Sequence, residues 1–178
     1  MKANFDVTPH LEDLWRYGRV LTHNDADADD LVQEALARAL SLARGYDASR
    51  PLLPWLITIV RNTFLTGITR ANAEKRRLAA YAVLSDPLLL PSQEHSVELS
   101  NVRKALAALP TEQAEVLHLV GVMGFTYSDA AEVIGVPTGT VMSRLSRARN
   151  TLRDNMDRSI DHASAHLRVV GGRLDGTR

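Results

Sequence analysis

The sequence contains no cysteine among its 178 residues. Disulfide bonds and thiolate metal sites are therefore excluded, and a reducing compartment is compatible with the composition. No uninterrupted apolar run reaches the roughly 20 residues that a membrane-spanning helix needs. The first ten residues, MKANFDVTPH, also lack the apolar core of a signal peptide. These absences predict a soluble, cytoplasmic protein with no membrane insertion.

A net charge is lacking as well, because 21 Lys and Arg balance 21 Asp and Glu. The charges are nevertheless segregated along the chain. Acidic side chains crowd the stretch Asp25–Glu34, whereas residues 61–77 carry five cations and one anion. A second basic stretch, residues 138–153, has four arginines and no acid. One acidic and two basic patches indicate separate binding partners.

Helical periodicity runs along nearly every segment, and no strand-like alternation competes with it. Helices are expected over residues 9–21, 31–43, 54–77, 97–109, 110–122 and 128–134, and in a longer segment that ends near residue 154. Two prolines interrupt the pattern in the middle of the chain. The sequence therefore predicts an all-α fold of two small helical domains, 8–84 and 97–158, with a flexible linker at 85–96 and a flexible tail at 159–178.

The stretch from Thr126 to Arg149 has the layout of a helix-turn-helix. A short helix, Ser128–Ile134, reaches Gly135, which tolerates positive φ, and a Gly-Val-Pro turn then leads into a longer helix. In this motif the second helix enters the major groove of DNA. A three-helix packing module with a solvated arginine face is the alternative, but the absence of any acid on the second helix favours DNA binding.

The second helix can be oriented from its own sequence, because apolar residues repeat at intervals of four, three and four. The expected buried stripe is Val141, Leu145, Ala148 and Leu152. The opposite face holds Ser143, Ser146, Arg147 and Asn150, with Met142 beside it. Arg144 and Arg149 flank the stripe. Exposed polar residues suit base edges, and flanking arginines suit phosphates.

Three ordered motifs resemble the extracytoplasmic-function (ECF) sigma factors of the sigma-70 family. They are Asp30-Leu-Val-Gln-Glu-Ala-Leu-Ala-Arg-Ala, Trp55-Leu-Ile-Thr-Ile-Val-Arg-Asn62, and Leu109-Pro-Thr-Glu-Gln-Ala-Glu-Val-Leu followed by Gly139–Arg149. The resemblance covers roughly residues 8–156. The layout around Asp30 and Ile59–Asn62 is also similar to the general-stress sigma factors of α-proteobacteria.

The resemblance implies that the first domain binds the clamp helices of the polymerase β′ subunit and melts the −10 element. Asp30, Gln33 and Glu34 would face the clamp helices. The −10 residues would be Tyr46, Asp47, Ala48, Ser49, Arg50, Arg61 and Asn62. Within this set the loop 46–50 would hold a flipped base and Asn62 would help to line its pocket, for which a Tyr and an Asn supply stacking and hydrogen bonds. A loop anchor and a helix-end hydrogen bond are the alternative roles of Tyr46 and Asn62.

The resemblance also implies that the second domain reads the −35 element beside the β flap of core RNA polymerase. The expected −35 residues are Met142, Ser143, Arg144, Ser146, Arg147 and Arg149. Met142 and Ser146 depart from the Arg and the aromatic residue of some relatives, so the −35 sequence cannot be transferred from them. An anti-sigma factor is the expected regulatory partner, and no cofactor or metal is expected.

Three other functions remain to be weighed. An enzyme is disfavoured because the sequence has no Gly-rich phosphate loop and no His-Glu-x-x-His; His162 and His166 fall in the expected tail. A sigma mimic that binds only an anti-sigma factor is disfavoured by the retained basic helix and by the lack of a receiver-like strand-helix pattern. A stand-alone repressor or activator that uses only Gly124–Asp154 would leave the first hundred residues unexplained, above all the acidic helix and the basic helix after it.

Overall fold

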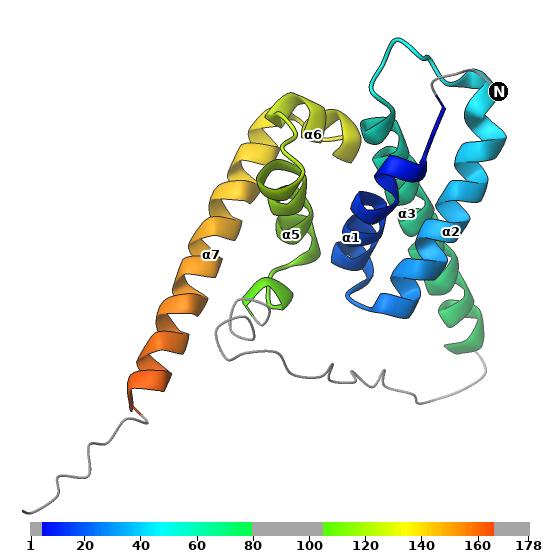
Figure 1. Ribbon diagram of the computed structural model, residues 1–178. Coiled ribbons are helices and arrows are strands. Elements are labelled where there is room, and N and C mark those ends of the chain that lie inside the picture. Colours follow the sequence, from blue (N-terminus) through cyan, green and yellow to red (C-terminus); the bar gives the residue numbers. More distant parts are fainter. Residues whose placement is uncertain (1–4, 80–104, 166–178) are drawn as a thin grey trace, which may run out of the picture.

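The computed structural model describes residues 5–79 and 105–165, with side chains described for 5–73 and 105–156. Within these ranges every regular element is a helix, which confirms the predicted all-α class. The N-terminal unit consists of α1 (Leu11–Thr22), α2 (Asp25–Leu42) and α3 (Leu52–Ala79). The C-terminal unit consists of α5 (Thr111–Leu117), α6 (Tyr127–Ile134) and α7 (Thr138–Ala165). Figure 1 shows the two units side by side. The predicted linker, 85–96, lies outside the described residues.

Helix α2 begins at Asp25, six residues before the predicted start at residue 31, and follows the N-cap Asn24, so the aspartates of the acidic stretch lie in its first turns. The Asn24 side chain accepts hydrogen bonds from the backbone N–H groups of Ala26 (2.8 Å) and Asp27 (3.3 Å). The helical spacing of the sequence predicts a buried face of Leu31, Val32, Ala35, Leu36, Ala39, Leu40 and Ala43, and four of these are buried: Leu31, Val32, Ala35 and Ala39. Leu40 was expected beside them but is 61% exposed. It lies about 100° around the helix from Ala39, beyond a buried stripe that is narrower than predicted.

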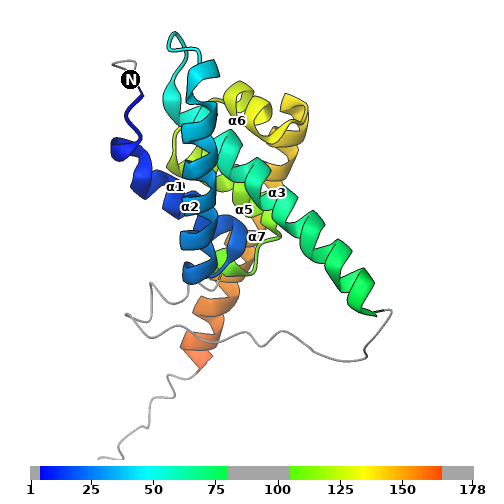
Figure 2. The same cartoon turned by 90° about the vertical axis from the view of Figure 1, so that its right-hand side faces the viewer.

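Helix α3 begins at Leu52, two residues before the predicted start. Pro54 therefore lies inside the first turn, where a missing N–H costs no intrahelical hydrogen bond. The first half of α3 is a core helix, since Leu56, Ile57 and Val60 are at most 1% exposed. The helical spacing of the sequence predicts that Leu65 and Ile68 continue the buried face of Leu56 and Val60, but they are 41% and 42% exposed. They belong to the half of α3 that extends past the other helices (Figure 2).

The segment Leu52–Ala73 of α3 is long and apolar enough to span a membrane by length and composition alone, with a mean hydropathy of 1.2 in its most apolar window. It contains Arg61 and Arg70, so it is not an uninterrupted apolar run. Its first half packs in the core described above, and the core helix of a soluble protein can be as long and as apolar as this segment. The composition of α3 therefore agrees with its place at the centre of the N-terminal unit.

The predicted helix 110–122 changes type at His118. Helix α5 ends at Leu117, and the wider turn η3 (His118–Val122) follows, in which the N–H of Met123 bonds to the carbonyl of His118 at 3.0 Å. Short 3₁₀ turns, η1 (Thr8–His10) and η2 (Ala43–Gly45), precede α1 and follow α2. Helix α6 begins with a capping box between Thr126 and Asp129 and ends at Gly135, whose φ is 72°.

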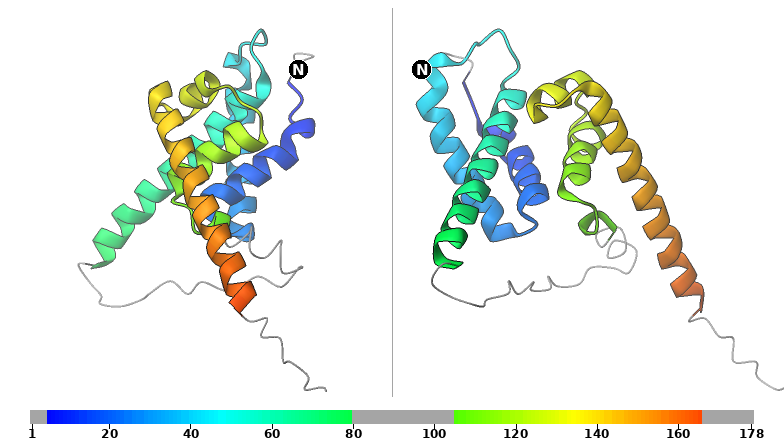
Figure 3. Two further views of the ribbon diagram at one scale, coloured as in Figure 1. Left: turned by 90° about the vertical axis from the view of Figure 1, so that its left-hand side faces the viewer. Right: turned by 180° about the vertical axis from the view of Figure 1, so that it is seen from behind.

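Helix α7 is longer than predicted. It continues to Ala165, into the segment 159–178 for which the sequence predicts a flexible tail. No glycine or proline occurs between Gly139 and Gly171 to end the helix earlier. Figure 3 shows the C-terminal part of α7 projecting away from the other helices. Residues 166–178 of the predicted tail lie outside the described part of the chain.

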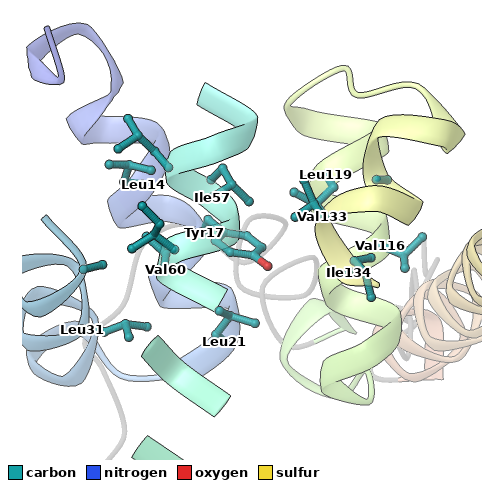
Figure 4. Close-up of a cluster of buried hydrophobic side chains, with 14 of the residues drawn as sticks. Leu14, Tyr17, Leu21, Leu31, Ile57, Val60, Val116, Leu119, Val133 and Ile134 are labelled. Carbon is teal, nitrogen blue, oxygen red and sulfur yellow. The ribbon is translucent and has the colours of Figure 1, made fainter. Parts of the chain in front are cut away.

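The two units share one hydrophobic core. Its buried members include Leu14, Tyr17, Leu21, Ile57 and Val60 from the N-terminal unit and Val116, Leu119, Val133, Ile134, Val141 and Leu145 from the C-terminal unit. In Figure 4 the ring of Tyr17 lies between the two sets, with its hydroxyl turned toward the C-terminal unit. Helix α1 contacts α5, and α3 contacts α6. The units are therefore packed against each other, and their joint surface is apolar.

Candidate polymerase and DNA interfaces

The predicted clamp-binding residues lie on one exposed face of α2. Asp30, Gln33 and Glu34 are all exposed, and their spacing of three and four residues makes them neighbours on a helix. Glu34 forms an ion pair with Arg38 at 2.5 Å, one turn further along. An exposed pair of this kind contributes little to stability. The acidic face of α2 is therefore accessible to a partner.

The loop between α2 and α3 is held by Tyr46. This side chain is 5% exposed and packs against the rings of Phe5 and Trp55, with ring centroids 5.8 Å and 5.1 Å away. Its hydroxyl donates to the backbone carbonyl of Arg50 and so closes the loop. Asp47 accepts hydrogen bonds from the backbone N–H (3.0 Å) and the hydroxyl (2.8 Å) of Ser49. In this arrangement Tyr46 has the geometry of a loop anchor.

A cavity of about 340 Å³ lies beside this loop. Its lining includes Tyr46 and Arg50 from the loop and Asp6, Pro9, His10, Pro51 and Leu52. Asn62 is not among the lining residues. It is exposed on α3, ten residues after Leu52, and this separation corresponds to about 15 Å along the helix axis. The structure thus brings Tyr46 and Arg50 to one cavity and leaves Asn62 on a separate part of the surface.

Arg61, one of the predicted −10 residues, is largely buried and paired with a carboxylate. Its Nε donates to Oε1 of Glu115 at 2.7 Å, and the Arg61 and Glu115 side chains are 17% and 6% exposed. The hydroxyl of Tyr17 donates to the same carboxylate oxygen, also at 2.7 Å. Burial, and next the charge of Glu115, raise the pKa of Tyr17 well above its ordinary value. Tyr17 is therefore a donor in this cluster at neutral pH.

Sequence reasoning did not identify Glu115 as a functional residue. A signal was present, because Glu115 precedes the buried Leu119 by four residues and hence shares its face of the helical segment. An acid on a buried face needs a partner. Its partners, Tyr17 and Arg61, are 98 and 54 residues away in the chain, so the sequence alone could not name them.

The predicted orientation of the second helix of the helix-turn-helix is confirmed by burial. Val141, Leu145 and Ala148 are at most 2% exposed, and Leu152 is half-buried. The opposite side presents Ser143, Ser146, Arg147 and Asn150 to solvent, with Met142 beside them, and Arg149 is exposed at the edge of the stripe. The guanidinium of Arg147 reaches back to the carbonyl of Ser143 at 3.2 Å. Helix α7 therefore offers a continuous polar face without any acidic side chain between residues 138 and 153.

Arg144 is an exception among the predicted −35 residues. Its guanidinium pairs with the carboxylate of Glu112 on α5 at 2.7 Å, and its side chain is 16% exposed. The pair joins α7 to α5 within the C-terminal unit. The structure places Arg144 at the edge of the buried stripe, as its position in the sequence predicts, and engages it with a carboxylate rather than leaving it on the polar face.

No group of three or more His, Asp or Glu side chains that could hold a metal ion occurs among the residues whose side chains are described. The side chains of His162 and His166, the pair considered in the sequence, lie outside that set.

Two family models match the chain. The model of sigma-70 region 2 matches residues 7–74, and the model of sigma-70 region 4 matches residues 99–152. The ECF RNA polymerase sigma factor EcfG of Rhodopseudomonas palustris is 38% identical over 153 residues, which cover 83% of this chain and 81% of that protein. The matched ranges contain the N-terminal unit up to residue 74 and the helix-turn-helix up to residue 152.

Two solved structures are similar in fold and sequence. The sigma factor RpoE of Bartonella quintana, solved in complex with the anti-sigma factor NepR, has a TM-score of 0.70 and 32% identity, covering 85% of this chain and 94% of its own. CnrH, solved with the cytosolic domain of CnrY, has a TM-score of 0.60 and 28% identity, covering 85% of each chain. With both family models matched in order and 38% identity to EcfG, the chain belongs to the ECF sigma factors of the sigma-70 family, which direct RNA polymerase to promoters.

Proposed function

We propose that this sigma factor works in the cytoplasm, without catalytic activity of its own, through three surfaces. The exposed acidic face of α2 binds the clamp helices of core polymerase, the loop 46–50 and α3 engage the −10 element, and the polar face of α7 reads the −35 element. The observation that carries the proposal is the acid-free exposed face of α7, opposite the buried Val141 and Leu145 in a capped helix-turn-helix.

The test of this function is transcription in vitro with core polymerase and the full chain, followed by mapping of the start sites on genomic DNA. Transcripts that start downstream of a shared pair of −10 and −35 elements are expected. A chain that binds promoter DNA yet does not associate with core polymerase would be a stand-alone regulator. A chain that binds only an anti-sigma factor would be a mimic.

At the −10 element, the cavity beside the loop is the proposed place for an unpaired base. Its volume of about 340 Å³ is enclosed in part by Tyr46 and Arg50. Because the Tyr46 ring is buried, we propose that it shapes the loop beside the base, whereas Asp47, Ala48 and Ser49, which do not line the cavity, contact the adjoining DNA from the loop. Asn62 would contact a neighbouring nucleotide, since it lies on the exposed surface of α3 away from this cavity.

Reversing the charge of Glu34 on the acidic face of α2 should weaken the binding of core polymerase. Glu34→Lys places a cation on the acidic face of α2, so we expect affinity for core polymerase to fall at least about tenfold, the range for disrupting an interfacial charge pair. Helical circular dichroism should not change, because Glu34 is exposed. Glu12→Lys is the matched control, since Glu12 forms the same type of exposed pair with Arg16 on α1. Equal affinities for both variants would contradict the assignment.

The −35 contact predicts different effects for two arginines of α7. Arg147 lies opposite the buried stripe, so Arg147→Ala should relax preference at one or two base pairs, at a cost of roughly 1–3 kcal/mol. Arg149 is placed better for phosphate, so Arg149→Ala should weaken all sequences about equally and reduce the salt slope by up to about one. The measurement is binding of the full chain, in the polymerase holoenzyme, to a library of −35 variants at two salt concentrations. The same sequence profile for both variants would mean that the helix is oriented wrongly.

We also propose that an anti-sigma protein holds this sigma factor inactive. RpoE of Bartonella quintana was solved in complex with the anti-sigma factor NepR, and CnrH was solved in complex with the cytosolic domain of CnrY. A candidate groove of about 430 Å³ lies between the units, where Trp15 and Val20 of α1 face Leu117, His118 and Val122. A regulator that fills this groove would contact both units at once. Protection of these residues from hydrogen exchange in the complex would support the groove as the site, and protection confined to α7 would contradict it.

A further inference from the structure

The carboxylate of Glu115 is buried in the contact between the two units. Its side chain is 6% exposed, and its Oε1 accepts hydrogen bonds from Tyr17 and Arg61 of the N-terminal unit. A carboxylate removed from water is costly unless charged and polar partners replace the lost hydration. Both partners come from across the interface, so Glu115 is satisfied only while the units are packed together.

A second ion pair crosses the same interface. Arg50, in the loop beside the cavity, lies 3.4 Å from the carboxylate of Glu132 on α6. Both side chains are more than 70% exposed, so this pair contributes little to holding the units together. It nevertheless shows a repeated pattern, because two arginines of the proposed −10 surface are paired with glutamates of the C-terminal unit. Only the Arg61 guanidinium is covered by its carboxylate partner, since Arg50 stays open to solvent.

We infer that Glu115 is an internal latch that closes the C-terminal unit over the N-terminal unit and withholds Arg61 from promoter DNA. In the closed arrangement Arg61 is neutralised and 17% exposed. When the units separate, Glu115 returns to water and Arg61 becomes accessible on α3. The latch itself depends only on the interface geometry. The role of the released Arg61 in −10 binding depends on the proposed function.

The chemistry of the latch makes it reversible. Burying an ion pair gains Coulomb attraction but loses the hydration of both ions, and the two contributions largely cancel. Separation of the units restores that hydration. The ion pair therefore fixes how the two units are oriented and adds little to the free energy of their association. The apolar core shared by the units, which includes Leu119 and Val133, supplies the remaining attraction. The ring of His118 stacks on that of Tyr17, with centroids 6.2 Å apart, and fixes the donor beside Glu115.

The test measures the distance between the units in the full chain without any partner. Because the sequence has no cysteine, Ser41→Cys on α2 and Ser128→Cys on α6 provide two unique, exposed positions for spin labels. Wild type should show a narrow distance distribution that matches the closed arrangement. Glu115→Gln should raise the ratio of open to closed molecules about tenfold, the effect expected when a charge-assisted hydrogen bond becomes a neutral one.

The matched control is Glu112→Gln, one turn earlier on α5. It removes the same charge, but its partner Arg144 belongs to the same unit, so the distance distribution should stay closed. Unchanged helical circular dichroism would show that both variants are folded. A closed distribution for Glu115→Gln, or an equal shift for both variants, would overturn the latch.

A separate measurement tests what the latch withholds. Binding of a fluorescent single-stranded −10 oligonucleotide should be tighter for Glu115→Gln than for wild type, and adding Arg61→Gln should remove the gain. If the spin-label distances widen in Glu115→Gln but the oligonucleotide affinity does not change, the assignment of Arg61 to −10 binding is wrong. The latch between the units is then still supported. Distances that do not widen overturn the latch whatever the affinity, so the two failures are distinguishable.

Discussion

Leu145→Asp is expected to unfold the C-terminal unit. Leu145 is 2% exposed and belongs to the core that α7 shares with α5, α6 and the N-terminal unit. An aspartate at this position would be buried without a partner, at a cost of several kcal/mol. A whole domain is stabilised by only about 5–15 kcal/mol, and a small one by less. We therefore expect a large loss of helical circular dichroism at 25 °C and no detectable −35 binding.

Ser146→Asp is the control for this substitution. It introduces the same charge at the next residue of α7, where the side chain is exposed on the polar face. Its helical content and melting temperature should stay close to those of wild type, although its DNA affinity should fall because a carboxylate repels phosphate. A folded Leu145→Asp variant, or equal unfolding of both, would contradict the orientation of α7.

Tyr46→Ala is expected to destabilise the N-terminal unit by about 3–5 kcal/mol, the range for removing a buried aromatic side chain. Tyr46 is 5% exposed, packs between Phe5 and Trp55, and holds the carbonyl of Arg50 through its hydroxyl. Its removal would leave a cavity and release the loop 46–50. Thermal unfolding should show the loss of stability, and open-complex formation should fall more than closed-complex affinity, because an unpaired base is available only after the strands separate.

Tyr46→Phe separates the packing of the ring from its hydrogen bond. The ring is retained and one hydrogen bond is lost, so we expect a cost of about 1 kcal/mol. Open-complex formation should remain near that of wild type if Tyr46 anchors the loop through its ring. A Phe variant as defective as the Ala variant would mean that the hydroxyl, and not the packed ring, carries the function of this residue.

The predictions from sequence were most accurate where local periodicity determines the structure. The orientation of α7 followed from the apolar spacing of Val141, Leu145 and Ala148, because one face of a helix must be buried whatever it packs against. Predicted burial was wrong for Leu40, Leu65 and Ile68. Whether an apolar residue at the edge of a stripe, or beyond the end of its neighbours, is covered depends on the lengths and crossing of other helices, and periodicity does not contain that information.

The sequence predicted the candidate surfaces that lie on one helix, but not the ion pairs between helices. The motifs identified the acidic face of α2 and the helix-turn-helix, since each of these surfaces belongs to one continuous segment. The engagement of Arg61 and Arg144 by Glu115 and Glu112 was not predictable. A basic residue within a DNA-binding motif can equally pair with an acid from another helix, and only the folded structure shows which one lies within reach.

The core shared by the two units makes their association depend on temperature. Closing buries apolar side chains such as Leu119 and Val133, and hydrophobic attraction is mainly entropic near room temperature, so it weakens on cooling. The cost of removing the ions of the Arg61–Glu115 pair from water is also greatest in the cold. The weaker hydrophobic attraction and the larger desolvation cost both disfavour closing on cooling. The closed arrangement is therefore favoured least at low temperature, and the same chain exposes Arg61 more readily in the cold than in the warm.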